Sequence, residues 1–180
     1  MRILGIDPGS NATGYGVVES QRGKLVHVAH GVLRPPRRAG VAQRLDYLHR
    51  TVCEVIEGHA PDVAAIEQIF VARSPRSALL LGQARGAVLV ALGGAGLVVH
   101  EFSPSQVKQG VTGSGRATKD QVKRMVSRLL GIDRVRASDA ADALAVAIRH
   151  AHGGRLEAAG VSPVPRRRRT APRVRVRVSS

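Results

Sequence analysis

Residues 2–33 read RILGIDPGSNATGYGVVESQRGKLVHVAHGVL, and their pattern indicates the fold class. Three short runs, Arg2–Asp7, Thr13–Ser20 and Leu25–Leu33, have the apolar, β-branched composition that is typical of strands. The polar residues Gln21–Lys24, with Gly23 among them, predict a turn that joins the second and third runs as a hairpin. The chain is therefore expected to begin as an antiparallel meander of three strands.

Helical and strand-like stretches alternate beyond this meander. Helical spacing of apolar residues and short apolar runs predict six elements in chain order: a helix over Gly40–His59, a strand over Val63–Gln68, a helix over Arg76–Leu92, a strand over Gly96–Phe102, and helices over Lys119–Leu130 and from Ser138 to about His150. Ser103 resembles a further helix start, and Gly110–Gly115 is expected to form a flexible glycine-rich loop. A meander followed by βαβ units predicts an α/β fold with a five-stranded mixed sheet flanked by helices.

The 180 residues carry a formal net charge of +15, from 28 Lys+Arg against 13 Asp+Glu. The length fits one compact domain plus a tail. We predict a domain over residues 1–152 and a disordered Arg/Pro-rich tail over 153–180, since this last stretch has eight arginines and no periodic apolar face. The part before the tail is also basic, which favours a nucleic-acid partner. An Arg-rich genome or a role in solubility remains an alternative explanation.

Three absences in the sequence favour a cytoplasmic protein. No basic segment, apolar stretch and cleavage site follow one another at the N-terminus, as they would in a secretory signal. No apolar run is expected to reach the roughly 20 residues of a membrane-spanning helix. A single cysteine, Cys53, excludes an intramolecular disulfide framework.

Four acidic residues occupy places where their side chains can converge. Asp7 ends the first strand, Glu67 lies near the end of the Val63–Gln68 strand, and Asp139 and Asp142 share one helix face because they are three residues apart. Converging carboxylates repel one another unless a cation lies among them. Oxygen ligands select Mg²⁺ or Mn²⁺ over Zn²⁺. Two such ions about 4 Å apart could activate water and stabilise the leaving oxygen of a phosphodiester.

Each of these acids also has a simpler structural explanation. Asp7 precedes Pro8-Gly9 and could be a turn residue. Asp139 could be a first-turn residue favoured by the helix dipole, and Asp142 could pair with an arginine. Glu67 is the hardest to explain in this way, because a carboxylate in an apolar strand is costly to bury without a partner.

Seven short segments follow one another over about residues 2 to 150: Gly5-Ile6-Asp7-Pro8-Gly9-Ser10, Thr13-Gly14-Tyr15-Gly16-Val17, Ala65-Ile66-Glu67-Gln68, Ser77-Ala78-Leu79, Leu81-Gly82-Gln83-Ala84-Arg85-Gly86, Gln106-Val107-Lys108-Gln109 and Asp139-Ala140-Ala141-Asp142-Ala143-Leu144-Ala145. In composition and order they resemble the RuvC family of bacterial Holliday junction resolvases. The Arg-rich tail after Gly153 is not part of the shared pattern.

The resemblance implies an RNase H-like fold and a homodimer with one active site per subunit. A dimer of this kind nicks two opposing strands of a four-way DNA junction symmetrically during recombination and repair, which suits the two-fold symmetry of the junction. The expected cofactor is Mg²⁺, two ions per site, with Mn²⁺ able to substitute. Hydrolysis is expected to leave a 5′-phosphate and a 3′-hydroxyl. The branch-migration proteins RuvA and RuvB are implied as partners.

The resemblance also assigns roles to individual residues. The four metal-binding acids of the family fall on Asp7, Glu67, Asp139 and Asp142, the same four that their spacing indicates. The family's functional lysines fall on Lys108 and Lys119, which are expected to meet phosphate near the scissile bond. Its junction-facing aromatic falls on Phe70, which could stack on a base or could instead be a buried loop anchor. Arg73 and Arg76 lie nearby and could hold phosphate, or could be ordinary solvated arginines.

Two other functions compete with this one. An actin- or sugar-kinase-like phosphotransferase shares the Gly-Ile-Asp strand and turn, but it needs a longer, two-lobed chain. Gly110–Gly115 does not supply a phosphate-binding loop, because Arg116 and Ala117 stand where the required Lys and Ser/Thr would be. A non-catalytic binder of branched DNA would explain the charge but not the pattern of four acids.

Overall fold

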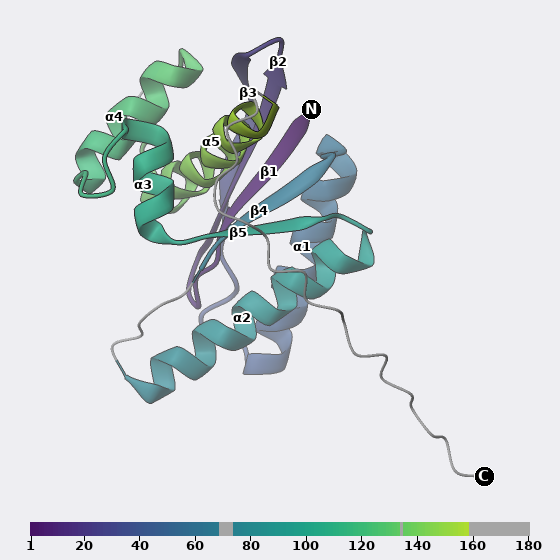
Figure 1. The fold of residues 1–180 in the computed structure, drawn as a ribbon. Coiled ribbons are helices and arrows are strands. Elements are labelled where there is room, and N and C mark those ends of the chain that lie inside the picture. The colour runs from purple at the N-terminus through teal and green to yellow at the C-terminus, as the bar shows by residue number, and fades with distance from the viewer. Residues whose placement is uncertain (69–73, 134, 159–180) are drawn as a thin grey trace, which may run out of the picture.

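The computed structural model describes residues 1–68, 74–133 and 135–158, within which five strands form one sheet in the order β3-β2-β1-β4-β5 (Figure 1). The strands are β1 (Arg2–Asp7), β2 (Thr13–Gln21), β3 (Lys24–Leu33), β4 (Val63–Glu67) and β5 (Val99–Phe102). The first three strands pair antiparallel, whereas β4 is parallel to both β1 and β5. The expected five-stranded mixed sheet is thus confirmed.

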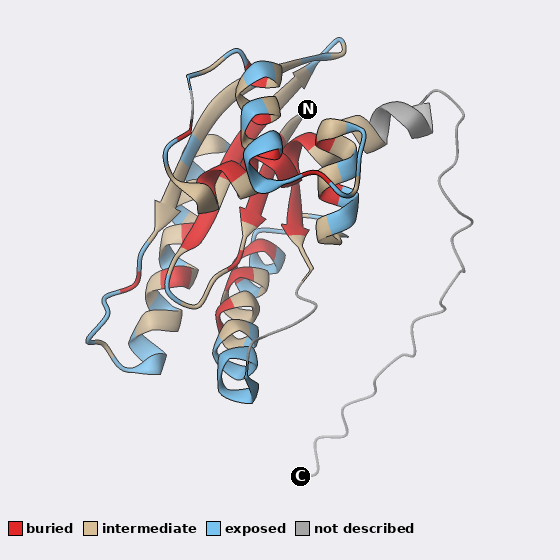
Figure 2. Ribbon diagram, turned by 90° about the vertical axis from the view of Figure 1, so that its left-hand side faces the viewer, coloured by how far each residue is buried: buried red, intermediate tan, exposed pale blue. Residues whose placement is uncertain are grey.

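Helices cover both faces of the sheet. They are α1 (Val41–His59), α2 (Pro75–Gly94), α3 (Pro104–Thr112), α4 (Lys119–Leu130) and α5 (Ser138–Ala158). Alternate residues of β1 pack into two hydrophobic cores, one on each face of the sheet, because successive side chains in a strand point to opposite faces. Ile3 packs with the side of the sheet that α3, α4 and α5 cover, and Leu4 and Ile6 pack with α1 and α2. Figure 2 shows the buried residues along the central strands and the helix faces turned toward them.

Helix α5 lies close against β1 and β2 because glycines face it. A Cβ added at Gly5 would overlap the main-chain oxygen of Ala143, and one added at Gly14 would overlap that of Asp139. The facing surface of α5 is rich in alanine, with Ala143 fully buried. This close contact brings the first turns of α5 next to the end of β1 where Asp7 lies.

Two boundaries differ from those expected. Gly110–Gly115 is not a flexible loop throughout, because α3 continues to Thr112 and ends at Gly113, whose φ of 77° provides the left-handed cap. Helix α5 continues to Ala158, past the expected start of the tail at Gly153. Glycine within a helix costs only about 1 kcal/mol relative to alanine, so glycine there does not by itself end a helix that is docked over most of its length.

The expectation that no segment reaches membrane-spanning length is wrong for α2 by length and composition alone. An 18-residue window of this 20-residue helix has a mean hydropathy of 1.3, and 22% of the window is buried. Core helices pass the same test, and α2 contributes Ala84, Val88 and Leu92 to the core it shares with α1. On the other side of α2, Leu79, Leu80 and Val90 are exposed.

Candidate active site

Two carboxylates lie side by side at one edge of the sheet. Asp7 is the last residue of β1 and Glu67 is the last residue of β4. These strands are parallel neighbours in which Ile6 pairs with Ile66, so the next residue of each strand is an acid. The carboxyl ends of parallel strands are the usual place for a site in an α/β sheet.

A third carboxylate, Asp142, comes from α5 and completes a cavity of about 230 Å³. The polar side chains that line the cavity are Asp7, Glu67, Lys108, Lys119 and Asp142, and its apolar lining comes from α3, α4 and α5. Asp139 is not among the lining residues. It lies one helical turn before Asp142, near enough for its charge to act on Asp7.

Burial and neighbouring negative charges raise the pKa of two acids, Asp7 and Glu67. Burial, together with the negative charges of Glu67, Asp142 and Asp139, raises the pKa of Asp7 to about 8. Burial and the charge of Asp142 also raise the pKa of Glu67. A site that raises the pKa of two acids in this way favours neutralisation by a proton or by a cation.

Two lysines from separate helices face these acids. Lys119 is the first residue of α4, and its Nζ lies 3.5 Å from Oδ2 of Asp142. Lys108, from the middle of α3, acts with Lys119 to lower the pKa of Glu67, although burial outweighs both. The cavity therefore combines carboxylates with ammonium groups that can contact phosphate.

The donors in this cavity fit a hard divalent cation, since the acids supply only oxygen. Within residues 1–68, 74–133 and 135–158, no three Asp, Glu, His or Cys side chains form a ready-made cluster at metal-binding distances. The carboxylates nevertheless need positive charge, as the raised pKa of Asp7 and the approach of the Lys119 ammonium to Asp142 indicate. Asp7, Glu67 and Asp142 are the residues that would hold such an ion.

The other predicted residues lie elsewhere. Arg76 is exposed in the first turn of α2 and lines a separate cavity of about 260 Å³, with Ser10 and Arg44, and not the carboxylate cavity. Phe70 and Arg73 fall outside the described residues. Sequence reasoning missed Arg44, whose Nη2 donates to the main-chain oxygen of Ser10 at 2.5 Å and so holds the loop after Asp7. No motif marks this arginine, because its partner is 34 residues away.

The raised pKa of Asp7 predicts how metal-free stability depends on pH. In the folded state the Asp7 carboxyl keeps its proton up to a pH of about 8, whereas in the unfolded chain it loses the proton near pH 3.8. The contribution of Asp7 to the free energy of unfolding is therefore fully present below pH 3.8 and is lost as the pH rises toward about 8. We expect Asp7→Asn to stabilise the metal-free protein at pH 9, by on the order of 5 kcal/mol at most. Thermal unfolding in a chelator at pH 5 and pH 9 measures this, and a variant less stable than wild type at pH 9 would contradict it.

This chain is similar to known proteins in both sequence and fold. A family model described as crossover junction endodeoxyribonuclease RuvC matches residues 3–150. The crossover junction endodeoxyribonuclease RuvC of Ralstonia nicotianae is 49% identical over 175 residues, 97% of each chain. The Thermus thermophilus RuvC structure is 37% identical, with a TM-score of 0.80 over 87% of this chain and 97% of that one.

A second Thermus thermophilus structure, RuvC in complex with Holliday junction substrate, is 36% identical, with a TM-score of 0.79 over 87% of this chain and 96% of that one. These matches confirm the RNase H-like fold predicted from the sequence. The match of the family model over most of the chain, and the identity to the Ralstonia protein, show that the chain belongs to the RuvC family of crossover junction endodeoxyribonucleases.

Proposed function

We propose that this chain resolves four-way DNA junctions by nicking two opposing strands symmetrically, and that it acts in recombination and repair. The observation that carries the proposal is the cavity in which Asp7, Glu67 and Asp142 face Lys108 and Lys119. Hydrolysis of a phosphodiester would leave a 5′-phosphate and a 3′-hydroxyl. The family pattern adds Asp139 as a fourth acid, and its effect on the pKa of Asp7 supports a place near the site.

Each residue of the cavity has a distinct task in this proposal. Asp7, Glu67, Asp142 and Asp139 would hold two Mg²⁺ ions, with Mn²⁺ able to substitute. Bound metal supplies a water activated for attack and charge that stabilises the leaving oxygen. Lys119 and Lys108 position the scissile phosphate through charge-assisted hydrogen bonds. Because Lys119 also contacts Asp142, it balances the acids before the DNA arrives.

The remaining contacts of the proposal follow from the family resemblance. Phe70 would stack on a base at the junction centre, and Arg73 and Arg76 would hold phosphates around it. The branch-migration proteins RuvA and RuvB are the proposed protein partners, and the cytoplasm is the proposed compartment. The Arg-rich stretch over residues 159–180 has no assigned role.

A homodimer is part of the proposal, and the outer face of α2 supports it. Leu79 and Val90, 63% and 64% exposed, lie on one side of the helix. Between them, Gly82 and Gly86 leave room, since an added Cβ at either would meet no described atom within 4 Å. An apolar stripe with small residues lets two helices approach closely, and a two-fold dimer pairs such a stripe with its own copy.

We expect the double variant Leu79→Glu/Val90→Glu to be monomeric, because it places a negative charge at each end of this apolar stripe. The measurement is molar mass by light scattering, where a monomer has 19.1 kDa. Val26→Glu, at an exposed apolar position of β3, is the control and should leave the oligomeric state unchanged. If the double variant keeps the mass of a dimer, α2 does not form the dimer interface.

The function itself is tested by incubating the wild-type protein with a synthetic four-way junction, with and without Mg²⁺. We expect paired nicks at symmetric positions only when Mg²⁺ is present, and ends that a ligase can seal. A non-catalytic binder of branched DNA would shift the junction on a gel and leave it uncut. That outcome would replace the nuclease with the binding module as the function.

A further inference from the structure

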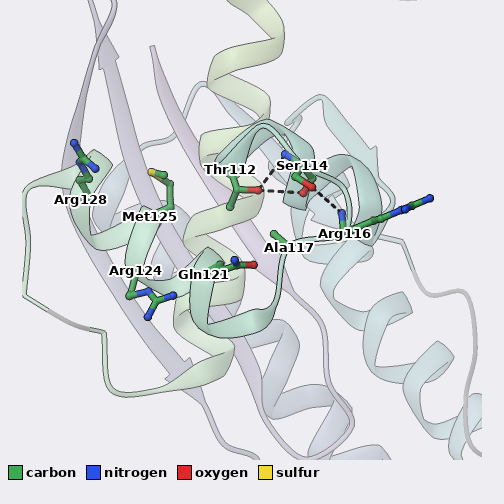
Figure 3. Close-up of a pocket in the computed structure, with 8 residues that line it drawn as sticks. All are labelled: Thr112, Ser114, Arg116, Ala117, Gln121, Arg124, Met125 and Arg128. Atoms are coloured by element: carbon green, nitrogen blue, oxygen red, sulfur yellow. Dashed lines mark hydrogen bonds between the residues drawn. The ribbon is translucent and has the colours of Figure 1, made fainter.

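A third, larger cavity lies between the end of α3 and α4, two helices that also line the carboxylate cavity. Its volume is about 600 Å³, against about 230 Å³ for the carboxylate cavity. Its lining contains no acidic residue and includes Arg116, Arg124 and Arg128, with Thr112 at the end of α3 and Ser114 on the connecting loop (Figure 3). Neither the family pattern nor the sequence reasoning assigned a role to this cavity.

Helix α4 forms a wall of both cavities. Lys119 and Val122, three residues apart, line the carboxylate cavity, whereas Arg124 and Arg128, four apart, line the basic one. These spacings put each pair on its own face of the helix. The basic side chains of α4 are therefore not confined to the carboxylate cavity.

The arginines of this basic cavity are available to a ligand. All three are exposed, and none forms an ion pair with a carboxylate in the parts of the chain that the structure describes. The loop between them is held in place by its own hydrogen bonds. The Thr112 hydroxyl donates to the main-chain oxygen of Lys108 at 2.8 Å, and the Ser114 amide donates to Thr112 Oγ1 at 3.2 Å. One wall of the basic cavity is thus the end of α3, the helix that carries Lys108, together with the loop that is hydrogen-bonded to it.

The guanidinium groups are spread out and do not converge on one point. Figure 3 shows the Arg116 side chain extending away from Arg124 and Arg128, which lie on the opposite side of the cavity. A compact anion is best bound by donors that converge on it. Separated cations instead match a ligand whose negative charges repeat along its length, as the phosphates of DNA do.

We propose that the basic cavity binds the phosphodiester backbone of a double-stranded DNA arm beside the cleavage site. This inference rests on the proposed function for the identity of its ligand, and it adds a contact surface outside the catalytic cavity. Arg124 and Arg128 contact successive phosphates, and Arg116 contacts the backbone at the other end of the cavity. Contacts of this kind fix the register of the arm without reading its sequence.

The test compares two double variants that each remove two positive charges. Arg124→Gln/Arg128→Gln changes the cavity, and Arg22→Gln/Lys24→Gln changes the β2–β3 turn, at the end of the sheet far from Asp7. Binding of linear duplex DNA is measured by fluorescence anisotropy over a range of salt, in a chelator so that nothing is cut. We expect the cavity variant to bind more weakly and to reduce the slope of log K against log salt by roughly 2 per protomer, since each lost phosphate contact removes roughly 0.9. The turn variant should keep the wild-type slope.

Several outcomes would overturn the inference. An unchanged slope in the cavity variant would show that the cavity does not contact DNA. An equal reduction of the slope in both variants would show an effect of the protein's net charge and not of a specific binding site. Inorganic phosphate is a further probe. If it displaces DNA from wild type more than chloride of equal ionic strength does, and this excess is lost in the cavity variant, the cavity is a compact-anion site. Junction cutting by the wild type in Mg²⁺ is scored separately, so a failed nuclease and a failed cavity give different results.

Discussion

Asp7→Asn and Glu67→Gln are each expected to lower the rate of junction cutting by more than about 100-fold while junction binding persists. Loss of even an outer-shell partner of a metal ligand typically costs roughly 10- to 100-fold, and these two side chains are proposed as direct ligands. Both substitutions keep the shape of the side chain and remove its charge. Binding should survive because phosphate is held by basic groups and not by the acids.

The measurement is single-turnover cleavage of a labelled four-way junction in Mg²⁺, with binding measured separately in a chelator. Asp46→Asn is the control, since Asp46 is an exposed acid of α1 that pairs only with Arg50 in the described part of the chain. It should cut at the wild-type rate. Thermal unfolding of Asp7→Asn under the assay conditions separates a loss of activity from a loss of fold. If either variant cuts at the wild-type rate, the carboxylates at the strand ends are not the metal ligands.

Gly5→Ala is expected to have the second large effect, on stability. The added methyl group would overlap the main-chain oxygen of Ala143 and crowd the backbone nitrogen of Ala147 at 2.7 Å. Backbone atoms of a docked helix cannot rotate away as a side chain can, so α5 must shift from the sheet. Overpacking of this kind costs roughly 1–3 kcal/mol and occasionally more, and we expect the upper end. For a chain of this size the melting temperature should fall by roughly 6–12 °C.

Gly58→Ala is the matched control, because a Cβ at Gly58 of α1 would meet no described atom within 4 Å. Alanine is also the better helix former by about 1 kcal/mol, so this variant should be as stable as wild type or slightly more stable. Thermal unfolding of the two variants side by side measures the difference. Equal melting temperatures would show that α5 does not depend on close contact with β1. Since α5 carries Asp142, any folded Gly5→Ala protein should also cut junctions more slowly.

The amino-acid pattern alone was enough to place the five strands and to point to the four acids as candidates. Each strand has a short apolar run bounded by turn residues, which is a local signal. Glu67 is the acid that the sequence marks most clearly, because a carboxylate in an apolar strand has few structural explanations. Asp7 could also have been a turn residue. The roles of Lys108 and Lys119 came from family resemblance and not from spacing, because each lies on its own helix with no local feature to mark it.

Tertiary structure alone decided which side chains meet. Asp139 and Asp142 are equivalent by sequence spacing, yet only Asp142 lines the cavity, because the docking of α5 on Gly5 and Gly14 sets which turn of the helix faces Asp7. Arg44 reaches the loop after Asp7 from 34 residues away. The basic cavity likewise forms only when α3 and α4 pack together. Contacts between distant segments depend on how whole elements pack, and the pattern of residues within one element does not record that packing.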